Sequence, residues 1–265
     1  MTATNARRER LYREYATFFE VSERRRRWDV FTDVPWEKLE AGRTDPELAY
    51  GAETFCGVEM YLPDYVSQGL NLVRDSFGQA WFQANWAYEE SKHSLVLREY
   101  LLRSGQRSAE QFDAFEQQIR SKRWKMPFQS ARQMTCYGSI QEAATQLLYQ
   151  KHLDLAKQRG DTVLAAIYSF VARDEAAHAA FYRKVLSVEL EDDRAGTLRD
   201  LSFVFANFRM PGVGLVPDYD TRIGFMRSAG VERATFLDLW FRLLRQLGTS
   251  RRELAAAAPA ATRPA

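Results

Sequence analysis

The chain has 265 residues, of which 46% are hydrophobic, and its formal net charge is +2 at pH 7. This is enough for a real hydrophobic core, as one large domain or two ordinary ones. The longest apolar stretch, residues 163–172, is about half a membrane span, and the N-terminus lacks the apolar region of a signal peptide. We therefore exclude a membrane span and expect a soluble, cytoplasmic protein. Cys56 and Cys136 form no Cys-x-x-Cys pair and are expected to be buried free thiols.

Helical periodicity dominates the sequence, and no convincing alternation of the strand type appears. We expect a charged lead-in helix over residues 1–27, a helical domain over 28–250 that starts with an irregular segment, and a disordered Ala/Pro-rich tail over 251–265. Further helices are expected at 51–75, 79–103, 130–158, 162–189, 198–208 and 233–248. Four long helices in succession, with little else, predict an all-α bundle.

Capping residues support these boundaries. Gly105 follows the second long helix as a C-cap, and Ser108 with Gln111 fits a capping box that starts another helix. Gly160 ends the 130–158 helix, and Asp161 is a suitable N-cap for the helix after it.

Basic residues are concentrated near the N-terminus, where Arg24 to Arg27 form an unbroken run. Such a run is most often a solvated face. The functional interpretation is a docking patch for an acidic partner. No nucleic-acid-binding motif accompanies the run, so we expect a protein partner and no nucleic acid.

Two of the three histidines lie in a Glu-x-x-His pattern, Glu90 with His93 and Glu175 with His178. Positions i and i+3 share one face of a helix, so each motif directs a carboxylate and an imidazole to one point. Two such helices, with one Glu from each of two others, form a dinuclear iron or manganese site in a helix bundle.

The remaining two carboxylates are predicted from their surroundings. Glu142 is the one acidic residue on the apolar face of the helix around residues 137–149. In the 51–75 helix, Pro63 leaves the carbonyl of Glu59 without its helical donor and would kink the axis there. Four glutamates with one imidazole per metal suit iron or manganese better than zinc or copper. We expect two irons, with manganese less favoured.

With these residues in place, the chain resembles the soluble acyl-carrier-protein desaturases from about Arg27 to Leu247. The resemblance is carried by four segments: Glu59-Met-Tyr-Leu-Pro63, Trp86-Ala-Tyr-Glu-Glu-Ser-Lys-His-Ser94, Gln141-Glu142-Ala-Ala-Thr145 and Asp174-Glu175-Ala-Ala-His178.

The resemblance implies a ferritin-like four-helix bundle core with additional helices, and it assigns roles to individual residues. The implied metal ligands are Glu59, Glu90, His93, Glu142, Glu175 and His178. It places Thr145 beside the oxygen-binding face, as the catalytic residue, and Trp28 and Asp174 on an electron-transfer route. It further implies a homodimer that uses dioxygen and a ferredoxin-type donor to desaturate an acyl chain on acyl carrier protein.

Departures from the family pattern surround the site. Ser91, Lys92 and Met60 stand where the family has Asn, Arg and Glu, and alanines replace other charged residues beside the ligands.

The alternative to a desaturase is a hydroxylase or N-oxygenase that acts on a carrier-bound or free biosynthetic intermediate. Iron storage or ferroxidase activity is disfavoured by the aromatic lining, and a rubrerythrin-like peroxidase by the absence of Cys-x-x-Cys.

The substrate pocket is expected along the stripe of residues that carries Glu142. Met134 and Gly138 precede Glu142 on this stripe, and Thr145 and Tyr149 follow it. Gly138 either leaves room for an acyl chain or permits close packing of two helices, and the sequence favours neither interpretation.

Overall fold

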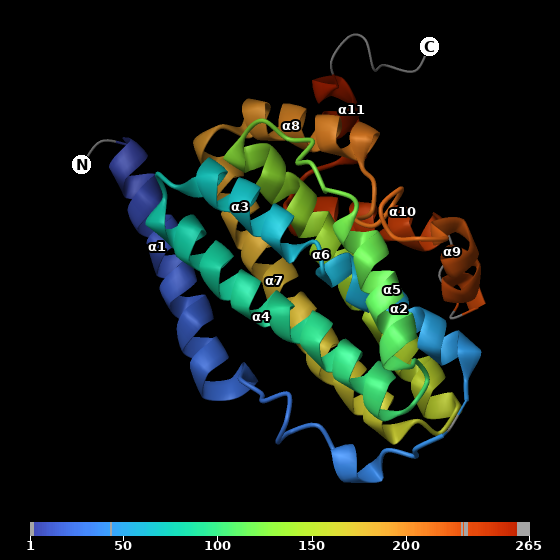
Figure 1. Cartoon of the computed structure of the whole chain (residues 1–265). Coiled ribbons are helices and arrows are strands. Elements are labelled where there is room, and N and C mark those ends of the chain that lie inside the picture. The colour runs from blue at the N-terminus through green and yellow to red at the C-terminus, as the bar shows by residue number, and fades with distance from the viewer. Residues whose placement is uncertain (1–2, 43, 229, 231–232, 259–265) are drawn as a thin grey trace.

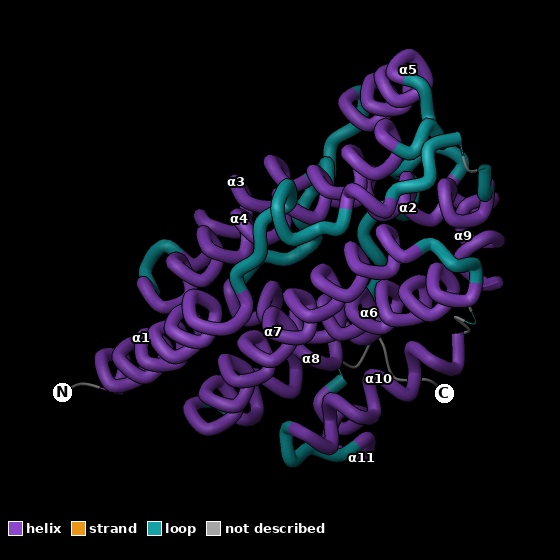
Figure 2. Tube along the Cα trace, turned by 90° about the horizontal axis from the view of Figure 1, so that it is seen from below, coloured by secondary structure: helices purple, strands orange, loops and turns teal. Residues whose placement is uncertain are grey.

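The computed structural model describes residues 3–42, 44–228, 230 and 233–258, and within these ranges it consists of helices and loops without strands (Figure 2). The predicted all-α class is therefore confirmed. The elements in chain order are α1 (Ala3–Val21), η1 (Ser22–Arg26), η2 (Trp36–Lys38), α2 (Pro46–Glu59), α3 (Leu62–Val73), α4 (Phe77–Arg103), α5 (Ala109–Arg120), α6 (Ala131–Gln158), α7 (Thr162–Asp192), α8 (Arg194–Asn207), α9 (Tyr219–Ser228), α10 (Arg233–Gln246) and α11 (Arg251–Ala257).

Helices α2, α4, α6 and α7 form the bundle, and the other helices surround it (Figure 1). Helix α1 packs against α4 and α7, while α9 packs against α2. Helices α8, α10 and α11 cover one end of α6 and α7, around a second hydrophobic cluster that includes Leu186, Leu201 and Trp240. No helix in the described part of the chain is long and apolar enough to cross a bilayer.

The predicted caps fix the ends of the long helices. The Asp161 carboxylate accepts a hydrogen bond from the backbone nitrogen of Leu164 at 2.8 Å, and Gly160 before it has a φ of +75°. Ser108 and Gln111 form the expected capping box of α5. Gly160 and Asp161 form the short connection between α6 and α7, which pack side by side. Both helices carry residues of the candidate site.

The expected 51–75 helix is wrong as one element, because the chain forms α2 and α3 with a break at Met60 and Tyr61. Pro63 lacks an amide donor, and its ring would clash with the carbonyl of Glu59 in a continuous helix. The structure places Pro63 in the first turn of α3, where no donor is required. Glu59 is consequently the last residue of α2.

Both ends of the chain are more integrated than the sequence suggested. Leu11 of α1 is fully buried against Phe82 and Phe181, so the charged lead-in helix belongs to the shell of the bundle. The tail was expected to be disordered from residue 251, but residues 251–257 form α11, and Leu254 is buried. The rest of the tail, 259–265, lies outside the described residues. Cys56 and Cys136 are buried free thiols, as expected.

Close contact between α1 and α4 depends on Gly78. A Cβ at this position would lie 2.6 Å from the backbone nitrogen of Tyr12 and closer still to the carbonyl of Leu11. We expect Gly78→Ala to separate the two helices and to lower the free energy of unfolding by about 1–3 kcal/mol, measured by urea denaturation. The control is Gly224→Ala, since Gly224 has no atom within 4 Å of the added Cβ. This change should be neutral or stabilising, and a loss of stability equal to that of Gly78→Ala would contradict the packing argument.

Candidate metal centre

Six buried side chains from the four bundle helices meet in the centre of the molecule. They form two groups, in each of which one possible ligand atom per residue lies within 4.8 Å of the others. The first group is Glu59, Glu90, His93 and Glu175, and the second is Glu90, Glu142, Glu175 and His178. Glu90 and Glu175 belong to both groups, so their carboxylates could bridge two cations. These are the six residues that the sequence predicted as ligands.

The donor set fits a dinuclear cation site. Oxygens of Glu90, Glu142 and Glu175 and the Nδ1 atom of His178 are buried without a hydrogen-bond partner, which is unfavourable unless something else binds them. Glu142 and Glu59 each belong to one of the two groups only, and each accepts a hydrogen bond from an aromatic side chain. Trp86 Nε1 donates to Glu142 at 3.1 Å, and the Tyr149 hydroxyl donates to Glu59 at 3.0 Å.

The pKa values of two glutamates in the cluster also indicate a cation site. Burial, together with the negative charges of Glu90 and Glu175, raises the pKa of Glu59 well above its usual value. Burial and Glu175 raise the pKa of Glu142 in the same direction. Without metal, these two carboxyl groups therefore stay protonated to a higher pH than exposed glutamates do, and divalent cations would displace the protons.

Each histidine is oriented by a carboxylate from the opposite helix. The Nε2 atom of His178 lies 2.8 Å from Glu89 of α4, and the Nε2 atom of His93 lies 3.4 Å from Asp174 of α7. Carboxylates such as Glu89 and Asp174 fix the imidazole ring and its tautomer, so that Nδ1 would be free to bind a metal. Sequence reasoning missed Glu89. The available signal was that an acidic residue precedes each Glu-x-x-His motif, which makes Glu89 the counterpart of Asp174.

One buried guanidinium joins these two carboxylates. Arg26 donates to Asp174 at 2.6 Å and to both oxygens of Glu89 at 3.1 and 3.2 Å, and it also contacts Ser22. Through Glu89 and Asp174, Arg26 is therefore connected to both histidines. It ends η1, the π-helical turn that follows α1.

The position of Arg26 corrects the predicted docking patch. The Arg26 side chain is only 8% exposed, and Arg27 is half-buried, donating to Glu89 and Asn85. Within the run, only Arg24 and Arg25 face solvent. A patch that uses all four arginines is therefore wrong, because two of them bind carboxylates behind the metal site.

The predicted electron-transfer residues are in contact. Trp28 Nε1 donates to Asp174 at 2.7 Å, and Asp174 in turn faces His93. The Trp28 ring stacks on Phe170 with a centroid distance of 5.0 Å, and the Lys92 ammonium lies 4.4 Å from its centre. Trp28, Asp174 and His93 thus form a continuous path to the cluster. That electrons travel along this path remains a prediction.

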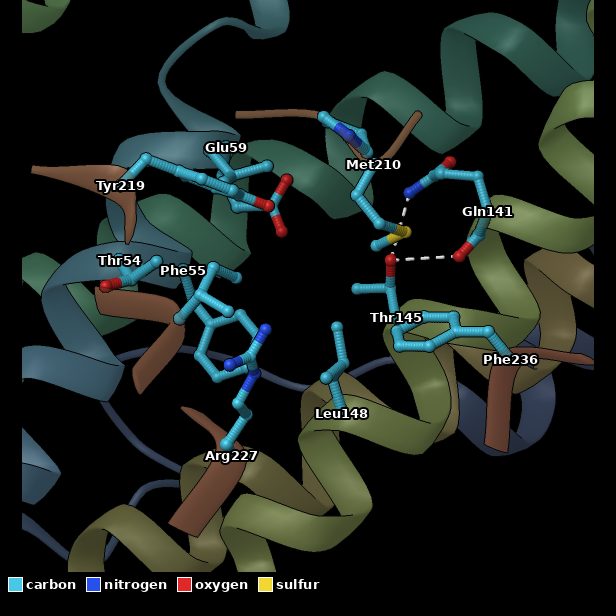
Figure 3. Close-up of a pocket in the computed structure, with 13 residues that line it drawn as sticks. Thr54, Phe55, Glu59, Gln141, Thr145, Leu148, Met210, Tyr219, Arg227 and Phe236 are labelled. Atoms are coloured by element: carbon cyan, nitrogen blue, oxygen red, sulfur yellow. Dashed lines mark hydrogen bonds between the residues drawn. The ribbon is translucent and has the colours of Figure 1, made fainter. Parts of the chain in front are cut away.

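An apolar cavity of about 350 Å³ opens beside the cluster (Figure 3). Glu59 and Thr145 form part of its wall, and the Thr145 hydroxyl donates to the Gln141 carbonyl at 3.0 Å. The remaining wall comes from α2, α6, the Met210–Pro211 loop, α9 and α10. Sequence reasoning missed α9 and α10 as pocket walls, because neither carries a recognisable motif.

The predicted pocket residues lie elsewhere. Met134 and Gly138 line a narrower cavity of about 60 Å³ that reaches Glu90 and Glu142, while Tyr149 packs beneath Glu59 and lines neither cavity. A Cβ on Gly138 would lie 2.8 Å from the Tyr182 ring. The structure thus supports the close-packing interpretation of Gly138, although its backbone also borders the narrow cavity.

An all-α bundle with two adjoining carboxylate–histidine groups defines a class of proteins, those with a dinuclear metal centre between helices. The sequence profile of the fatty acid desaturase family matches residues 58–235, and the chain belongs to this family. The resemblance recognised in the sequence is thereby confirmed.

Curated relatives include two plant enzymes. Stearoyl-[acyl-carrier-protein] 9-desaturase 5 of Arabidopsis thaliana is 31% identical over 153 residues, which cover 54% of this chain and 38% of the relative. Acyl-[acyl-carrier-protein] desaturase 4 of Oryza sativa subsp. japonica is 31% identical over 164 residues, covering 58% and 39%. The match thus spans about two fifths of the length of these relatives.

Solved structures share the fold. The putative acyl-ACP desaturase DesA2 from Mycobacterium tuberculosis H37Rv matches with a TM-score of 0.69 and 16% identity, over 96% of this chain and all of that chain. An R2-like ligand-binding oxidase from Sulfolobus acidocaldarius matches with a TM-score of 0.53 and 14% identity, over 92% and 91% of the chains. These matches confirm the predicted ferritin-like fold.

The contacts of Arg26 generate a prediction about metal affinity. Arg26→Gln removes the cation that Asp174 and Glu89 share and leaves Glu89 with Arg27 alone, so both histidines are held less firmly. We expect metal affinity, measured by titration with ferrous iron under anaerobic conditions, to fall by about 10–100-fold. Arg24→Gln, at a side chain 75% exposed, is the matched control and should change nothing. Equal affinity in Arg26→Gln and the control would refute the role assigned to Arg26.

A second prediction concerns pH. Burial lowers the pKa of His93, but Glu90, Asp174 and Glu175 outweigh it and raise this pKa well above its usual value. The pKa values of Glu59 and Glu142 are also raised. Because of these three groups, the folded metal-free protein binds more protons than the unfolded chain above about pH 5. Its stability should therefore fall as pH rises from about 5 toward 8.

Calorimetry of the metal-free and metal-loaded proteins checks this dependence. The melting temperature of the metal-free protein should decrease over that range, whereas metal binding requires deprotonated ligands and should become tighter. A metal-free protein that gains stability with pH would show that the cluster is not protonated.

Proposed function

We propose that the protein is a dinuclear iron oxidoreductase that introduces a double bond into an acyl chain presented by acyl carrier protein. Membership of the fatty acid desaturase family supports the reaction type. The observation that carries the proposal is the apolar cavity of about 350 Å³ whose wall includes Glu59, a member of the metal cluster. A site for a hydrocarbon chain has these properties, namely an apolar lining with few polar groups beside the reacting position.

The six residues of the cluster would hold two iron ions, which would supply the activation of dioxygen. In the balanced reaction, two adjacent methylenes lose one hydrogen atom each, and dioxygen takes up these two hydrogen atoms together with two further electrons and two protons to give two waters. The lining residues Phe55, Val58 and Leu148 would hold the chain against the cluster and exclude water. Thr145 has a hydroxyl at the cavity wall, where it could deliver a proton to the oxygen side of the site.

The remaining components of the proposal follow from the family. Electrons would come from a ferredoxin-type donor by way of Trp28 and Asp174, and the protein would act as a homodimer in the cytoplasm. Iron is proposed over manganese because the resemblance is to di-iron desaturases, while some R2-like oxidases of the same fold carry a Mn/Fe cofactor.

Metal content gives the first test. The protein should bind about two irons per chain, and Glu142→Ala should lose at least one of them, because Glu142 belongs to one of the two groups only. Glu175→Ala removes a residue shared by both groups and should abolish binding of both irons. Plasma emission spectrometry measures the iron. Full occupancy in both variants would refute the ligand assignment.

Product analysis tests the reaction and the cavity together. Reduced protein with dioxygen and acyl-carrier-protein substrates of graded length should yield an alkene by mass spectrometry, whereas a hydroxylated product would favour the alternative oxygenase.

Leu148→Phe narrows the cavity and should shift the preference toward shorter chains, with iron content unchanged. Thr145→Val should keep substrate binding and consume oxygen without matching product. An unaltered length preference in Leu148→Phe would place the chain outside this cavity.

A further inference from the structure

Helix α9 forms one wall of the apolar cavity, although it is not a helix of the bundle. Tyr219, Ile223 and Arg227 line the cavity and are spaced by four residues, so they share one face of α9. Figure 3 shows Tyr219 and Arg227 on one side of the cavity and Thr145 of α6 on the other. The position of α9 therefore determines how much room the cavity offers.

Helix α9 depends on other parts of the molecule for its position. It has ten residues, and an isolated helix shorter than about 12 to 15 residues is only marginally stable in water. Tyr219 and Ile223 are only partly buried against the main hydrophobic cluster, and both face the cavity. The bundle helix against which α9 packs is α2. Contacts with α2 must therefore keep the α9 wall in place.

Arg222, on a neighbouring face of α9, provides such contacts. Its side chain is 5% exposed and donates to the Glu53 carboxylate of α2 at 2.7 Å. It also donates to the Thr54 hydroxyl at 3.3 Å and to the Pro217 carbonyl, just before α9, at 2.8 Å. Arg222 thus ties α9 to two successive residues of α2. Thr54 is itself part of the cavity wall, so this anchor and the cavity share a residue.

A second guanidinium group completes the surroundings of Glu53. Arg107, in the segment between α4 and α5, donates to the same carboxylate at 2.6 and 3.3 Å. The guanidinium groups of Arg222 and Arg107 lie 5.2 and 5.3 Å from the centre of the Tyr50 ring. A buried ion pair is favourable only when its partners keep a well-defined arrangement. The pair of Arg222 with Glu53 therefore holds α9 at one place along α2.

We propose that Arg222 is a positioning residue for the acyl chain. By binding Glu53 and Thr54 it fixes the α9 wall, and this wall sets the longest chain that the apolar cavity accepts. The inference rests on the proposed function, because it takes the cavity as the site of the chain. Arg222 and Glu53 belong to neither of the two ligand groups, so the anchor is separate from the metal cluster.

Two variants form a matched pair for the test. Arg222→Gln and Arg107→Gln each remove one of the two guanidinium groups that bind Glu53, but only Arg222 belongs to α9. In hydrogen–deuterium exchange of the metal-loaded protein, the amides of α9 should exchange about tenfold faster in Arg222→Gln than in wild type. Arg107→Gln should leave the exchange of α9 unchanged. Equal exchange of α9 in the two variants would contradict the anchoring role.

Chain length gives a readout that a purely structural role would not change. The metal-loaded protein is titrated by calorimetry with uncharged N-acetylcysteamine thioesters of increasing chain length, which requires no turnover. Wild type should reach a length beyond which the affinity falls. At two carbons beyond this limit, Arg222→Gln should bind about tenfold more tightly than wild type, because two further methylenes are buried.

The control variants should keep the wild-type limit. Arg107→Gln leaves α9 anchored, and Arg222→Lys retains a cation for Glu53 and should restore the limit that Arg222→Gln loses. An unchanged limit in Arg222→Gln, or the same shift in Arg107→Gln, would overturn the proposal.

Ile223→Ala tests the wall with the anchor intact, so the proposal stays falsifiable if Arg222→Gln does not fold. Shortening this side chain should also move the limit toward longer chains. Gly224→Ala is the control on the same helix, since no atom lies within 4 Å of the added Cβ, and it should keep the wild-type limit. An unchanged limit in Ile223→Ala would show that α9 does not bound the chain, which overturns the proposal.

Failure of this inference differs from failure of the proposed function. If the length limit shifts in Arg222→Gln but reduced protein with dioxygen forms no oxidised product, the reaction is wrong and the anchor stands. If product forms while Arg222→Gln keeps the wild-type limit, the anchor is wrong and the reaction stands.

Discussion

A cluster of buried carboxylates is the constraint on which the rest of this structure depends. Four glutamates lie inside a bundle that is otherwise packed by apolar and aromatic side chains. Ionised carboxylates are highly unfavourable there unless cations or hydrogen bonds compensate them. The two histidines meet part of this requirement, Arg26 compensates the two further carboxylates that orient them, and the unpartnered oxygens define where cations would complete it.

The hydrogen bonds and ion pairs around the cluster extend to the N-terminal segment. Glu89 and Asp174 each serve the histidine of the opposite helix, and Arg26 binds both of them. Folding of α1 and η1 against the bundle is thereby linked to the order of the two histidines in the cluster. Arg26 is in the middle of an arginine run, which shows that a dense run of one charge can include a residue with an internal structural role.

The cavities beside the cluster follow from the way the outer helices pack around the bundle. The break between α2 and α3 puts Glu59 at a helix end, where it borders both the narrow and the apolar cavity. Helices α9 and α10 close the apolar cavity. The helix break thus makes one carboxylate of the cluster part of the wall of both cavities.

The all-α class, the caps of the long helices and the six residues of the cluster could be predicted from the amino-acid sequence. These depend on local spacing, since i and i+3 share a helix face and Asp161 or Pro63 act within one turn. Three features could not be predicted in this way: the burial of Arg26, the packing of Gly138 against Tyr182, and the contribution of α9 and α10 to the wall of the apolar cavity. Each of these depends on side chains far apart in the chain, and their spatial relation follows from how the helices pack rather than from any periodicity along the sequence.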